Sequence, residues 1–511
     1  MRIRHEVGLV ATMADGVALV ADAWYPEEGA PFPVLLQRLP YGRAVASAPV
    51  FPPPVQLARR GYAVVVQDVR GRGDSEGEFE PFVNEGCDGA ATVEWAAGLP
   101  FSDGNVVTYG FSYQGLAQIA AAAHRPNGLR AIAPMMCATE PYEMLYEGEC
   151  LLWEASARWA AQLATGERDD ERVEANLERK PLDAALGDRS PAWFGRWTRE
   201  DSPDAPYWRR CAPDLSAVEV PVFTVVGYAD TFAAATSRLI RRLGAEAVVG
   251  PWAHMPWGTR LGDLELRDAN PTVAIEAFLS FVDGVLGRAP RPAPETRYYT
   301  VGAGWRQAPG FPPPGRNLVL HARSVVGANS RHGDGELCPW PAPERLDDVI
   351  VSEPLAPYPG SPSPYPDVAA AEDRRDVLCY TTPPLDSACE LVGSPRVVAR
   401  LSSDVECFDV MATLSIVTEA ASRRLCVGAG RLQTTPGCEL QATIDLGPIA
   451  WRLEVATRLR LDVSASLAPL FATNPQTGRP IPATARRGEH RVATIELTAA
   501  TLSVSLAEDG G

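Results

Sequence analysis

The sequence predicts an α/β domain with a helical insertion, followed by an all-β domain, and two observations carry this prediction. In the N-terminal half, apolar strand-like runs alternate with helical stretches, which is typical of a mostly parallel sheet with helices on both faces. Beyond residue 294, short β-patterned runs are separated by Pro, Gly and Asn turns, as in a β-sandwich. The strand-like runs of the first half lie at 34–37, 62–67, 105–109 and 130–133, and its helical stretches include 88–97 and 113–123.

The chain opens on a predicted hairpin, in which the alternating runs 10–13 and 17–20 flank a turn. The segment 139–214 breaks the β–α alternation, because it is rich in Glu, Arg, Ala and Trp at helical spacing. A Pro-rich stretch at 288–294 is typical of a linker. We therefore expect a discontinuous α/β domain, a helical cap and a C-terminal β-sandwich domain, with bounds at 1–138 plus 215–287, at 139–214 and at 295–511.

Composition narrows the class of function. The formal net charge of -17 argues against binding to nucleic acid or to an anionic membrane surface, since both need a basic patch. No run approaches the roughly 20 apolar residues that span a bilayer, and no signal-peptide segment is recognisable, so we expect a cytoplasmic protein. The ten cysteines are scattered and include no C-x-x-C pair. We expect reduced thiols, no metal site and no cofactor.

The most informative local pattern is Gly110-Phe111-Ser112-Tyr113-Gln114-Gly115. It lies between an apolar run at 106–109 and an Ala-rich helical run that begins at Leu116. A serine at a sharp strand-to-helix turn is the arrangement of a nucleophile elbow, in which the helix N-terminus directs backbone N–H groups at the reacting centre. Taken alone, Ser112 is equally well explained as a helix N-cap.

A nucleophilic serine needs a histidine base and a carboxylate that orients it, in the chain order Ser, Asp or Glu, His. Of the six histidines, His254 directly follows an apolar strand at 247–249. Asp230 follows the preceding strand at 221–226. Open α/β sheets place their reacting groups at the carboxyl ends of strands. The other histidines lie before the first strand, at the end of the helix after Ser112, or in the all-β region.

Several further motifs make the chain resemble the CocE/NonD family of serine hydrolases, relatives of bacterial cocaine esterases and X-prolyl dipeptidyl aminopeptidases. The elbow matches the G-x-S-Y-x-G form of that family. The other matching runs are Leu39-Pro40-Tyr41, Asp68 to Gly77, Asp88-Gly89 with Glu94-Trp95, Tyr228 to Phe232, Gly250 to His254, Thr382 to Leu385 and Asn474 to Gly478.

The resemblance implies an α/β-hydrolase domain with a helical cap and a C-terminal jelly roll. It also implies a catalytic triad of Ser112, Asp230 and His254. In this family, a tyrosine hydroxyl and the amide after the nucleophile form the oxyanion hole. Those donors are Tyr41 and the amide of Tyr113 in this chain. The expected chemistry is two-step acyl transfer through an ester of Ser112.

The substrate class is less constrained. The α-amino acid ester hydrolases of the superfamily carry carboxylates just after the catalytic aspartate, whereas this chain has Phe232 there, which suggests an apolar acyl pocket. Among the aromatic residues of the cap, Trp153 and Trp159 are the candidates to line that pocket. Five cap glutamates are alternative partners for a substrate ammonium group: Glu140, Glu143, Glu147, Glu149 and Glu154.

We therefore expect an enzyme that cleaves a small-molecule ester, as a monomer or a homodimer. Three other interpretations stay open at this point. An X-Pro dipeptidyl peptidase or amidase would use the same triad with an amine-binding site, and an acyltransferase would pass the acyl group to an acceptor other than water. A catalytically silent binding protein on the same scaffold is disfavoured by the intact set Ser112, Asp230, His254 and Tyr41.

Overall fold

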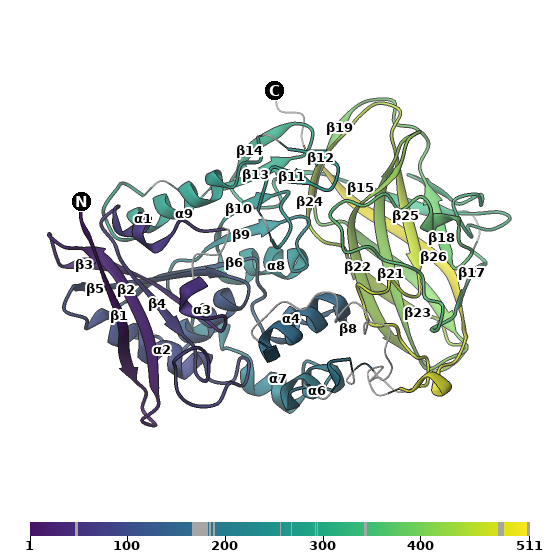
Figure 1. The fold of residues 1–511 in the computed structure, drawn as a ribbon. Coiled ribbons are helices and arrows are strands. Elements are labelled where there is room, and N and C mark those ends of the chain that lie inside the picture. Colours follow the sequence, from purple (N-terminus) through teal and green to yellow (C-terminus); the bar gives the residue numbers. More distant parts are fainter. Residues whose placement is uncertain are drawn as a thin grey trace.

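The protein divides into an α/β part formed by the N-terminal half and an all-β part formed by the C-terminal half, with helices between them (Figure 1). The fold is described from a computed structural model. It covers residues 1–45, 50–165, 182, 185–187, 190–255, 257–266, 268–291, 293, 295–341, 345–478 and 485–507.

The α/β part is built on a twisted, mostly parallel sheet. Its first strands are β1 (Ile3–Thr12), β2 (Ala18–Pro26), β3 (Phe32–Leu39), β4 (Ala63–Asp68), β5 (Ser102–Phe111) and β6 (Leu129–Met135). They lie in the order β1-β2-β4-β3-β5-β6, and β3, β4, β5 and β6 are mutually parallel. β4 is buried at every position, as expected for a central strand covered on both faces. The predicted hairpin and the four predicted strands are confirmed.

The sheet continues through four more strands. These are β9 (Phe223–Gly227), β10 (Glu246–Gly250), β13 (Thr296–Thr300) and β14 (Gly304–Ala308). A parallel bridge between Ile132 and Val222 and a 2.9 Å hydrogen bond from Met136 N to Val225 O join β6 to β9. β10 then pairs in parallel with both β9 and β13.

The β13–β14 hairpin departs from the expected domain boundary. We expected the C-terminal domain to begin at residue 295, directly after the Pro-rich linker. The structure instead adds β13 to the edge of the α/β sheet, because its main chain completes the open edge of β10. The chain therefore crosses the linker and returns to the first sheet before it enters the all-β part.

Helices cover both faces of this sheet. They are α1 (Pro54–Ala58), α2 (Glu85–Ala97), α3 (Tyr113–Ala122), α8 (Ala233–Leu243) and α9 (Thr272–Val285). Leu116 of α3 and Leu239 of α8 pack into one apolar core, whereas Leu57 of α1 and Phe278 of α9 pack into another. Alternate residues of the strands supply both cores, which is the arrangement that the β–α alternation predicts.

The chain between β6 and β9 forms the helical layer that the sequence predicts as a cap. Its described elements are a short hairpin of β7 (Tyr146–Glu147) and β8 (Cys150–Leu151), followed by α4 (Trp153–Thr165), α6 (Ala192–Arg199) and α7 (Pro206–Cys211). Trp197 is fully buried, with ring centroids 5.0 Å from Trp159 and 4.6 Å from Trp193. The predicted cap residues 166–181, 183–184 and 188–189 lie outside the described residues. Over the described chain, no helix is both long and apolar enough to cross a membrane.

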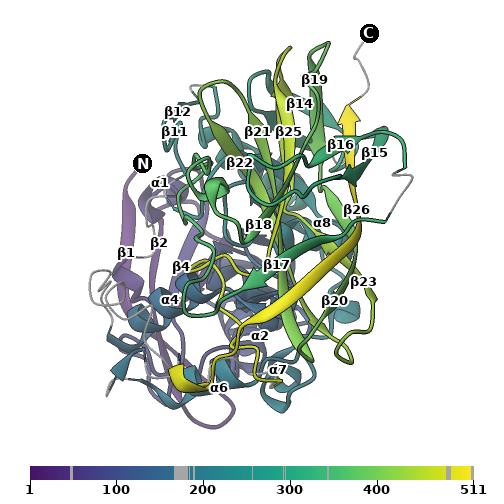
Figure 2. The same ribbon diagram turned by 90° about the vertical axis from the view of Figure 1, so that its right-hand side faces the viewer.

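The all-β part is a nearly closed sandwich of the jelly-roll type. Figure 2 shows its long C-terminal strand running diagonally across the face. The strands are β15 (Gly315–Arg323), β16 (Glu336–Cys338), β17 (Asp348–Ser352), β18 (Val377–Thr381), β19 (Cys389–Gly393), β20 (Arg396–Ser403), β21 (Cys407–Val417), β22 (Ser422–Gln433), β23 (Leu440–Asp445), β24 (Ile449–Leu453), β25 (Arg458–Ser464) and β26 (Ala493–Ala507). β26 pairs with β15, β17, β19 and β20, so it ties the sandwich together. Two short strands before α9 complete the list, β11 (Arg260–Leu261) and β12 (Leu264–Glu265).

The all-β part holds two loops of the rest of the protein. The amide of Trp153, the first residue of α4, donates to the carbonyl of Leu470 at 2.9 Å. The hydroxyl of Tyr365 donates to the carbonyl of Pro251 at 3.0 Å. Pro251 belongs to the loop after β10. The C-terminal domain thus fixes both the start of the cap helix and the loop that carries His254.

Candidate active site

Ser112 stands at the sharp turn between β5 and α3. Its backbone has φ of +61° and ψ of -130°, a conformation that is costly for any residue other than glycine. The neighbouring Gly110 and Gly115 leave room for this turn. A Cβ atom on Gly115 would lie 2.6 Å from Cys137 Sγ, and one on Gly110 would lie 2.5 Å from Gln114 Oε1. The predicted strand–serine–helix arrangement is confirmed, and it does not use the serine side chain as an N-cap.

Asp230 and His254 lie within hydrogen-bond distance of each other. Asp230 follows β9 and His254 follows β10, and adjacent parallel strands bring both loops to the same edge of the sheet. His254 Nδ1 lies 2.9 Å from Asp230 Oδ1. The Asp230 side chain is fully buried, whereas the imidazole is 27% exposed. Nδ1 is occupied by the carboxylate, which leaves Nε2 as the ring nitrogen for proton transfer.

The imidazole ring is held between two aromatic side chains. Phe111 lies with its ring centroid 5.5 Å from that of His254, and Phe232 packs edge-on at 5.1 Å. Trp257 donates its indole N–H to the carbonyl of His254 at 3.1 Å. These contacts restrict the ring to one orientation.

Tyr41 leaves the end of β3 on the same side of the sheet. Its hydroxyl accepts a 3.0 Å hydrogen bond from Nε1 of Trp159 in the cap. Two further hydrogen bonds hold the loop around Tyr41. Arg72 Nε donates to Pro40 O at 2.7 Å, and the amide of Arg43 donates to Asp68 Oδ1 at 2.6 Å. The Asp68 to Gly77 run, whose role the sequence did not indicate, thus positions the Tyr41 loop.

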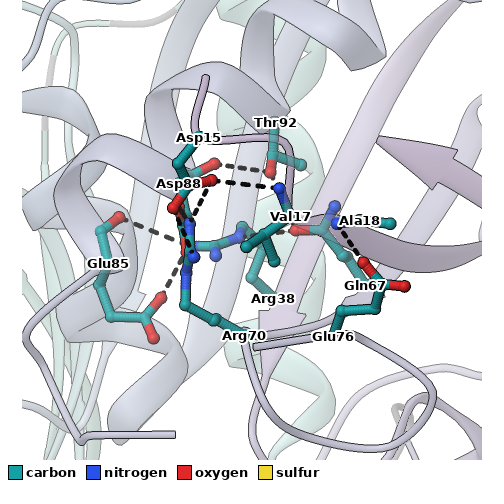
Figure 3. A network of polar contacts seen from close by, with 10 residues as sticks. All are labelled: Asp15, Val17, Ala18, Arg38, Gln67, Arg70, Glu76, Glu85, Asp88 and Thr92. Carbon is teal, nitrogen blue, oxygen red and sulfur yellow. Dashed lines mark hydrogen bonds and ion pairs between the residues drawn. The ribbon is translucent and has the colours of Figure 1, made fainter. Parts of the chain in front are cut away.

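Tyr113 is the first residue of α3, so its amide has no acceptor within the helix. Its side chain is fully buried and donates to Glu85 Oε1 at 2.8 Å. Glu85 in turn is paired with Arg38 at 2.7 Å, and Arg38 Nε donates to Gln67. Figure 3 shows this buried network of Arg38, Glu85 and Gln67 with its neighbour Thr92. Burial raises the pKa of the Tyr113 phenol well above its ordinary value. The network anchors the residue whose amide follows Ser112.

A second cluster of charged side chains in Figure 3 joins helix α2 to the first hairpin. Arg70 pairs with Asp88 of α2 at 2.7 Å and with Asp15 of the first hairpin at 2.7 Å. Arg38 lies in β3, and Arg70 lies in the Asp68 to Gly77 run. Neither arginine lines the cavity that contains Ser112. They act on the site through the positions of the turns that they hold.

Ser112, His254 and Tyr41 line one cavity of about 630 Å³. Trp159 and Phe232 line it as well, as the sequence predicts for an apolar pocket. Its further apolar lining comes from Leu39, Met144 and Leu145. Among the described residues, no three His, Cys, Asp or Glu side chains are grouped so that they could hold a metal ion.

Trp153 is the one predicted pocket residue that the structure does not bring to the cavity. It is 2% exposed, and its ring centroid lies 6.3 Å from that of Phe194 in the cap interior. The cavity is lined instead by residues that follow it on α4, among them Ala155 and Ser156. The first turn of α4 directs Trp153 inwards, a direction that composition alone does not reveal.

Four of the five cap glutamates named above form ion pairs with arginines. Arg238 of α8 binds Glu147 through two hydrogen bonds of 2.9 and 3.0 Å and lies 3.3 Å from Glu143. Glu154 forms an ion pair with Arg158 one turn further along α4. Arg242 lies 2.9 Å from Glu143 and 3.7 Å from Glu140. Glu149, by contrast, is exposed.

Comparisons with known families agree with this architecture. The sequence pattern of the X-Pro dipeptidyl-peptidase (S15 family) matches residues 15–256, and that of the X-Pro dipeptidyl-peptidase C-terminal non-catalytic domain matches residues 290–497. A curated relative, the cocaine esterase of Rhodococcus sp. (strain MB1 Bresler), is 29% identical over 92% of this chain and 92% of its own. The chain is a serine hydrolase, and both of its domains match patterns of the S15 family.

Solved structures of other hydrolytic enzymes show the same fold. An aminopeptidase from a marine sediment Thaumarchaeota archaeon superposes with a TM-score of 0.83 at 22% identity, over 99% of this chain and 96% of its own. A CocE/NonD family hydrolase from Staphylococcus aureus superposes with a TM-score of 0.72 at 17% identity, over 99% and 94%. At these identities the likeness establishes the two-domain hydrolase fold.

Proposed function

We propose that this serine hydrolase cleaves a small-molecule carboxylic ester with Ser112 as nucleophile, His254 as general base and Asp230 as the orienting acid. The observation that carries the proposal is the 2.9 Å contact between His254 Nδ1 and Asp230 Oδ1. His254 lines the same cavity as Ser112, whose backbone is strained. His254 Nε2 takes the Ser112 proton as Oγ attacks the carbonyl, and then protonates the leaving alcohol. Water, activated by the same nitrogen, releases the acid from the acyl-serine.

We further propose that Tyr41 Oη and the amide of Tyr113 donate to the tetrahedral oxyanion. Support comes from their separate anchoring, Tyr41 by Trp159 and Tyr113 by Glu85. Donors that are fixed before the reaction stabilise developing charge without reorganisation.

An ester substrate is favoured over an X-Pro peptide by the charges around the cavity. A dipeptidyl peptidase must bind a free substrate ammonium group. Glu154, which lines the cavity, is already paired with Arg158, and Glu147 of the cap is paired with Arg238. The position after the catalytic aspartate loop holds Phe232, which offers an apolar edge. We therefore assign the cavity beside Ser112 to the acyl group of the ester substrate.

Labelling with a fluorophosphonate probe, together with hydrolysis of p-nitrophenyl butyrate, tests the proposal. Wild-type protein is expected to react with the probe and to release p-nitrophenol, and Ser112→Ala is expected to lose both. Ser156→Ala removes another buried serine that lines the cavity, and it is expected to keep the label. Full turnover by Ser112→Ala would overturn the assignment. Faster cleavage of an X-Pro anilide than of any ester would favour the peptidase.

We also propose a cytoplasmic location and a homodimer as the states to test. The cysteines support the first, since all ten lie in the described residues and no disulfide joins them. Thiol titration of protein purified without reductant checks the redox state. Light scattering coupled to gel filtration checks the dimer.

A further inference from the structure

Arg72 lies between the Tyr41 loop and the cap helix α4. It belongs to the loop after β4 and lines the cavity that contains Ser112. Its Nε donates to the carbonyl of Pro40 at 2.7 Å, and its Nη1 donates to the carbonyl of Leu163 at 2.8 Å. Pro40 directly precedes Tyr41, whereas Leu163 lies in the last turn of α4. The planar fork of one guanidinium therefore connects the two elements.

These two hydrogen bonds close a ring with the contact between Tyr41 and Trp159. The Trp159 indole donates to the Tyr41 phenol at 3.0 Å, and Trp159 lies one turn before Leu163 on α4. The ring runs from Tyr41 to Pro40, through Arg72 to Leu163, and along α4 back to Trp159. Because the ring is closed, α4 cannot slide or rotate over the Tyr41 loop without breaking at least one of these hydrogen bonds.

The surroundings of the guanidinium suit this connecting role. The last carbonyls of a helix have no N–H donor within the helix, and the partial negative charge at that end attracts a cation. Arg72 Cζ also lies 5.0 Å from the ring centroid of Phe79, whose own centroid lies 6.4 Å from that of Tyr113. Arg72 is thus bonded next to one proposed oxyanion donor and packed against the aromatic neighbour of the other.

Charge pairing does not account for the position of Arg72. Within the part of the chain that the structure describes, no carboxylate lies within ion-pair distance of its guanidinium. Asp68 acts on it electrostatically but is paired with Arg43 at 2.6 Å. Burial lowers the pKa of Arg72, because the guanidinium loses water without gaining a direct counter-charge. The two backbone carbonyls are therefore the partners that its placement serves.

We infer that Arg72 is a positioning residue for the proposed oxyanion hole, because it holds the Tyr41 loop and the Trp159 helix together. This inference rests on the proposed function of Ser112 and Tyr41. The Tyr41 phenol needs a fixed loop to meet the oxyanion, and it needs α4 in place to accept from Trp159. The oxyanion forms only after Ser112 attacks, so loss of Arg72 affects kcat more than KM.

The test uses p-nitrophenyl butyrate and two inhibitors of matching size. Propyl trifluoromethyl ketone is attacked by Ser112 Oγ, whose proton passes to His254 while the carbonyl oxygen becomes an oxyanion. This adduct resembles the tetrahedral intermediate, whereas the corresponding secondary alcohol binds without forming an adduct. Arg72→Met is expected to lower kcat about 10- to 100-fold and to raise the Ki of the ketone by a similar factor. KM and the Ki of the alcohol should change by less than about threefold.

Arg72→Lys separates the fork from the charge. Lysine keeps the positive charge, but its ammonium lacks the planar fork that serves two carbonyls, so a loss of at least about fivefold in kcat and in ketone affinity is expected. Arg72→Met combined with Tyr41→Phe should resemble Tyr41→Phe alone, because Arg72 acts through the phenol.

Arg196→Met is the matched control. Arg196 of α6 also stacks on an aromatic ring, that of Tyr207, and it joins α6 to the loop before α2 through an ion pair with Glu80. It does not line the cavity. Its kcat and both Ki values should therefore stay close to those of the wild type.

Three results would overturn the inference. These are Arg72→Met with wild-type kcat and ketone affinity, Arg72→Lys that matches the wild type, and strictly multiplicative effects of the Arg72 and Tyr41 substitutions. The last result would assign Arg72 to the packing of the cap. Should Arg72→Met fail to fold, Arg72→Lys decides the question.

Failure of the proposed function is recognised in the wild type itself. The ester would then not be hydrolysed, the ketone and the alcohol would bind alike, and Ser112→Ala would not weaken the ketone. The inference would fall with it. Tight ketone binding that depends on Ser112 but not on Arg72 would instead refute the inference alone.

Discussion

The indole N–H of Trp159 donates to the phenol oxygen of Tyr41 at 3.0 Å, across 118 positions of the sequence. Trp159 lies on cap helix α4 and Tyr41 follows the core strand β3, so one hydrogen bond couples the cap to the proposed oxyanion donor. Donation onto Oη polarises the phenol and strengthens its own O–H as a donor. Under the proposed mechanism, the cap therefore takes part in the chemistry as well as in enclosing the cavity.

Removal of this hydrogen bond is expected to slow acylation. Tyr41→Phe should lower kcat by about 10²–10³, the usual effect of losing one oxyanion donor. Trp159→Phe keeps an aromatic ring but not the N–H, and about a tenfold lower kcat is expected with a smaller change in KM. Since both changes act through the same phenol, the double variant should resemble Tyr41→Phe alone.

Steady-state kinetics of the four proteins on p-nitrophenyl butyrate measure this coupling. Trp193→Phe serves as control, because Trp193 packs in the cap beside Trp197 and does not line the cavity. Strictly multiplicative effects of the Tyr41 and Trp159 substitutions would show that the indole acts on packing only.

The contact between Asp230 and His254 predicts a large effect of an isosteric change. Asp230→Asn retains the shape of the side chain but removes the negative charge that fixes the Nδ1–H tautomer. A loss in kcat on the order of 10⁴ is expected, as for triads generally. Thermal unfolding should show a folded protein, which separates this loss from misfolding. A decrease of less than tenfold would contradict the role of Asp230 as the orienting acid.

Asp201 of the cap should make stability depend on pH. Burial raises its pKa to about 6, although Arg431 Nη1 lies 3.5 Å from Oδ2 and opposes the rise. The folded pKa lies above the ordinary value of 3.8. The stabilising contribution of this carboxyl is therefore fully present below about pH 4 and is lost as the pH rises through about 6.

Asp201→Asn removes that titration. The Tm of the wild type minus that of the variant should therefore fall between pH 4 and pH 7, as measured by differential scanning fluorimetry. Asp204→Asn provides a control, since Asp204 is an exposed carboxylate paired with Arg209. Parallel Tm profiles for wild type and Asp201→Asn would contradict the prediction.

The elbow glycine Gly115 should not tolerate a side chain. A Cβ atom there would lie 2.6 Å from Cys137 Sγ and 3.3 Å from the amide nitrogen of Met135, so Gly115→Ala is expected to destabilise the fold by about 1–3 kcal/mol. Adding Cys137→Ala should restore part of that loss by removing the sulfur. Urea unfolding measures both, and equal stability of Gly115→Ala and wild type would show that β6 moves away without penalty.

The elements that follow from short-range pattern were predictable. Ser112, Asp230 and His254 each follow a strongly apolar strand. Parallel strands bring their carboxyl ends to one edge of the sheet, so the positions of these residues in the chain predict that they lie close together. Tyr41 needed the family resemblance, because a tyrosine after a strand has no distinctive local signal. The structure supports its proposed role by placing it in the same cavity.

Features that depend on distant pairing were not predictable. Tyr365 lies 114 positions after Pro251, and nothing in its neighbourhood indicates that its hydroxyl holds the loop that carries His254. Trp153 and Trp159 share one helix, yet only the packing of α4 against Phe194 decides which of them faces the cavity. The pairing of Glu140, Glu143 and Glu147 likewise depends on arginines of α8.

The return of β13 and β14 to the first sheet has a consequence for exchanging modules between relatives. A chimera joined in the Pro-rich stretch near residue 290 would bring a foreign hairpin into the catalytic sheet, opposite Val248 and Val249 of β10. A joint between Ala308 and Gly315, after β14 and before β15, would keep that hairpin with its native neighbours. For recombination, the C-terminal module therefore begins about two strands later than the sequence suggests.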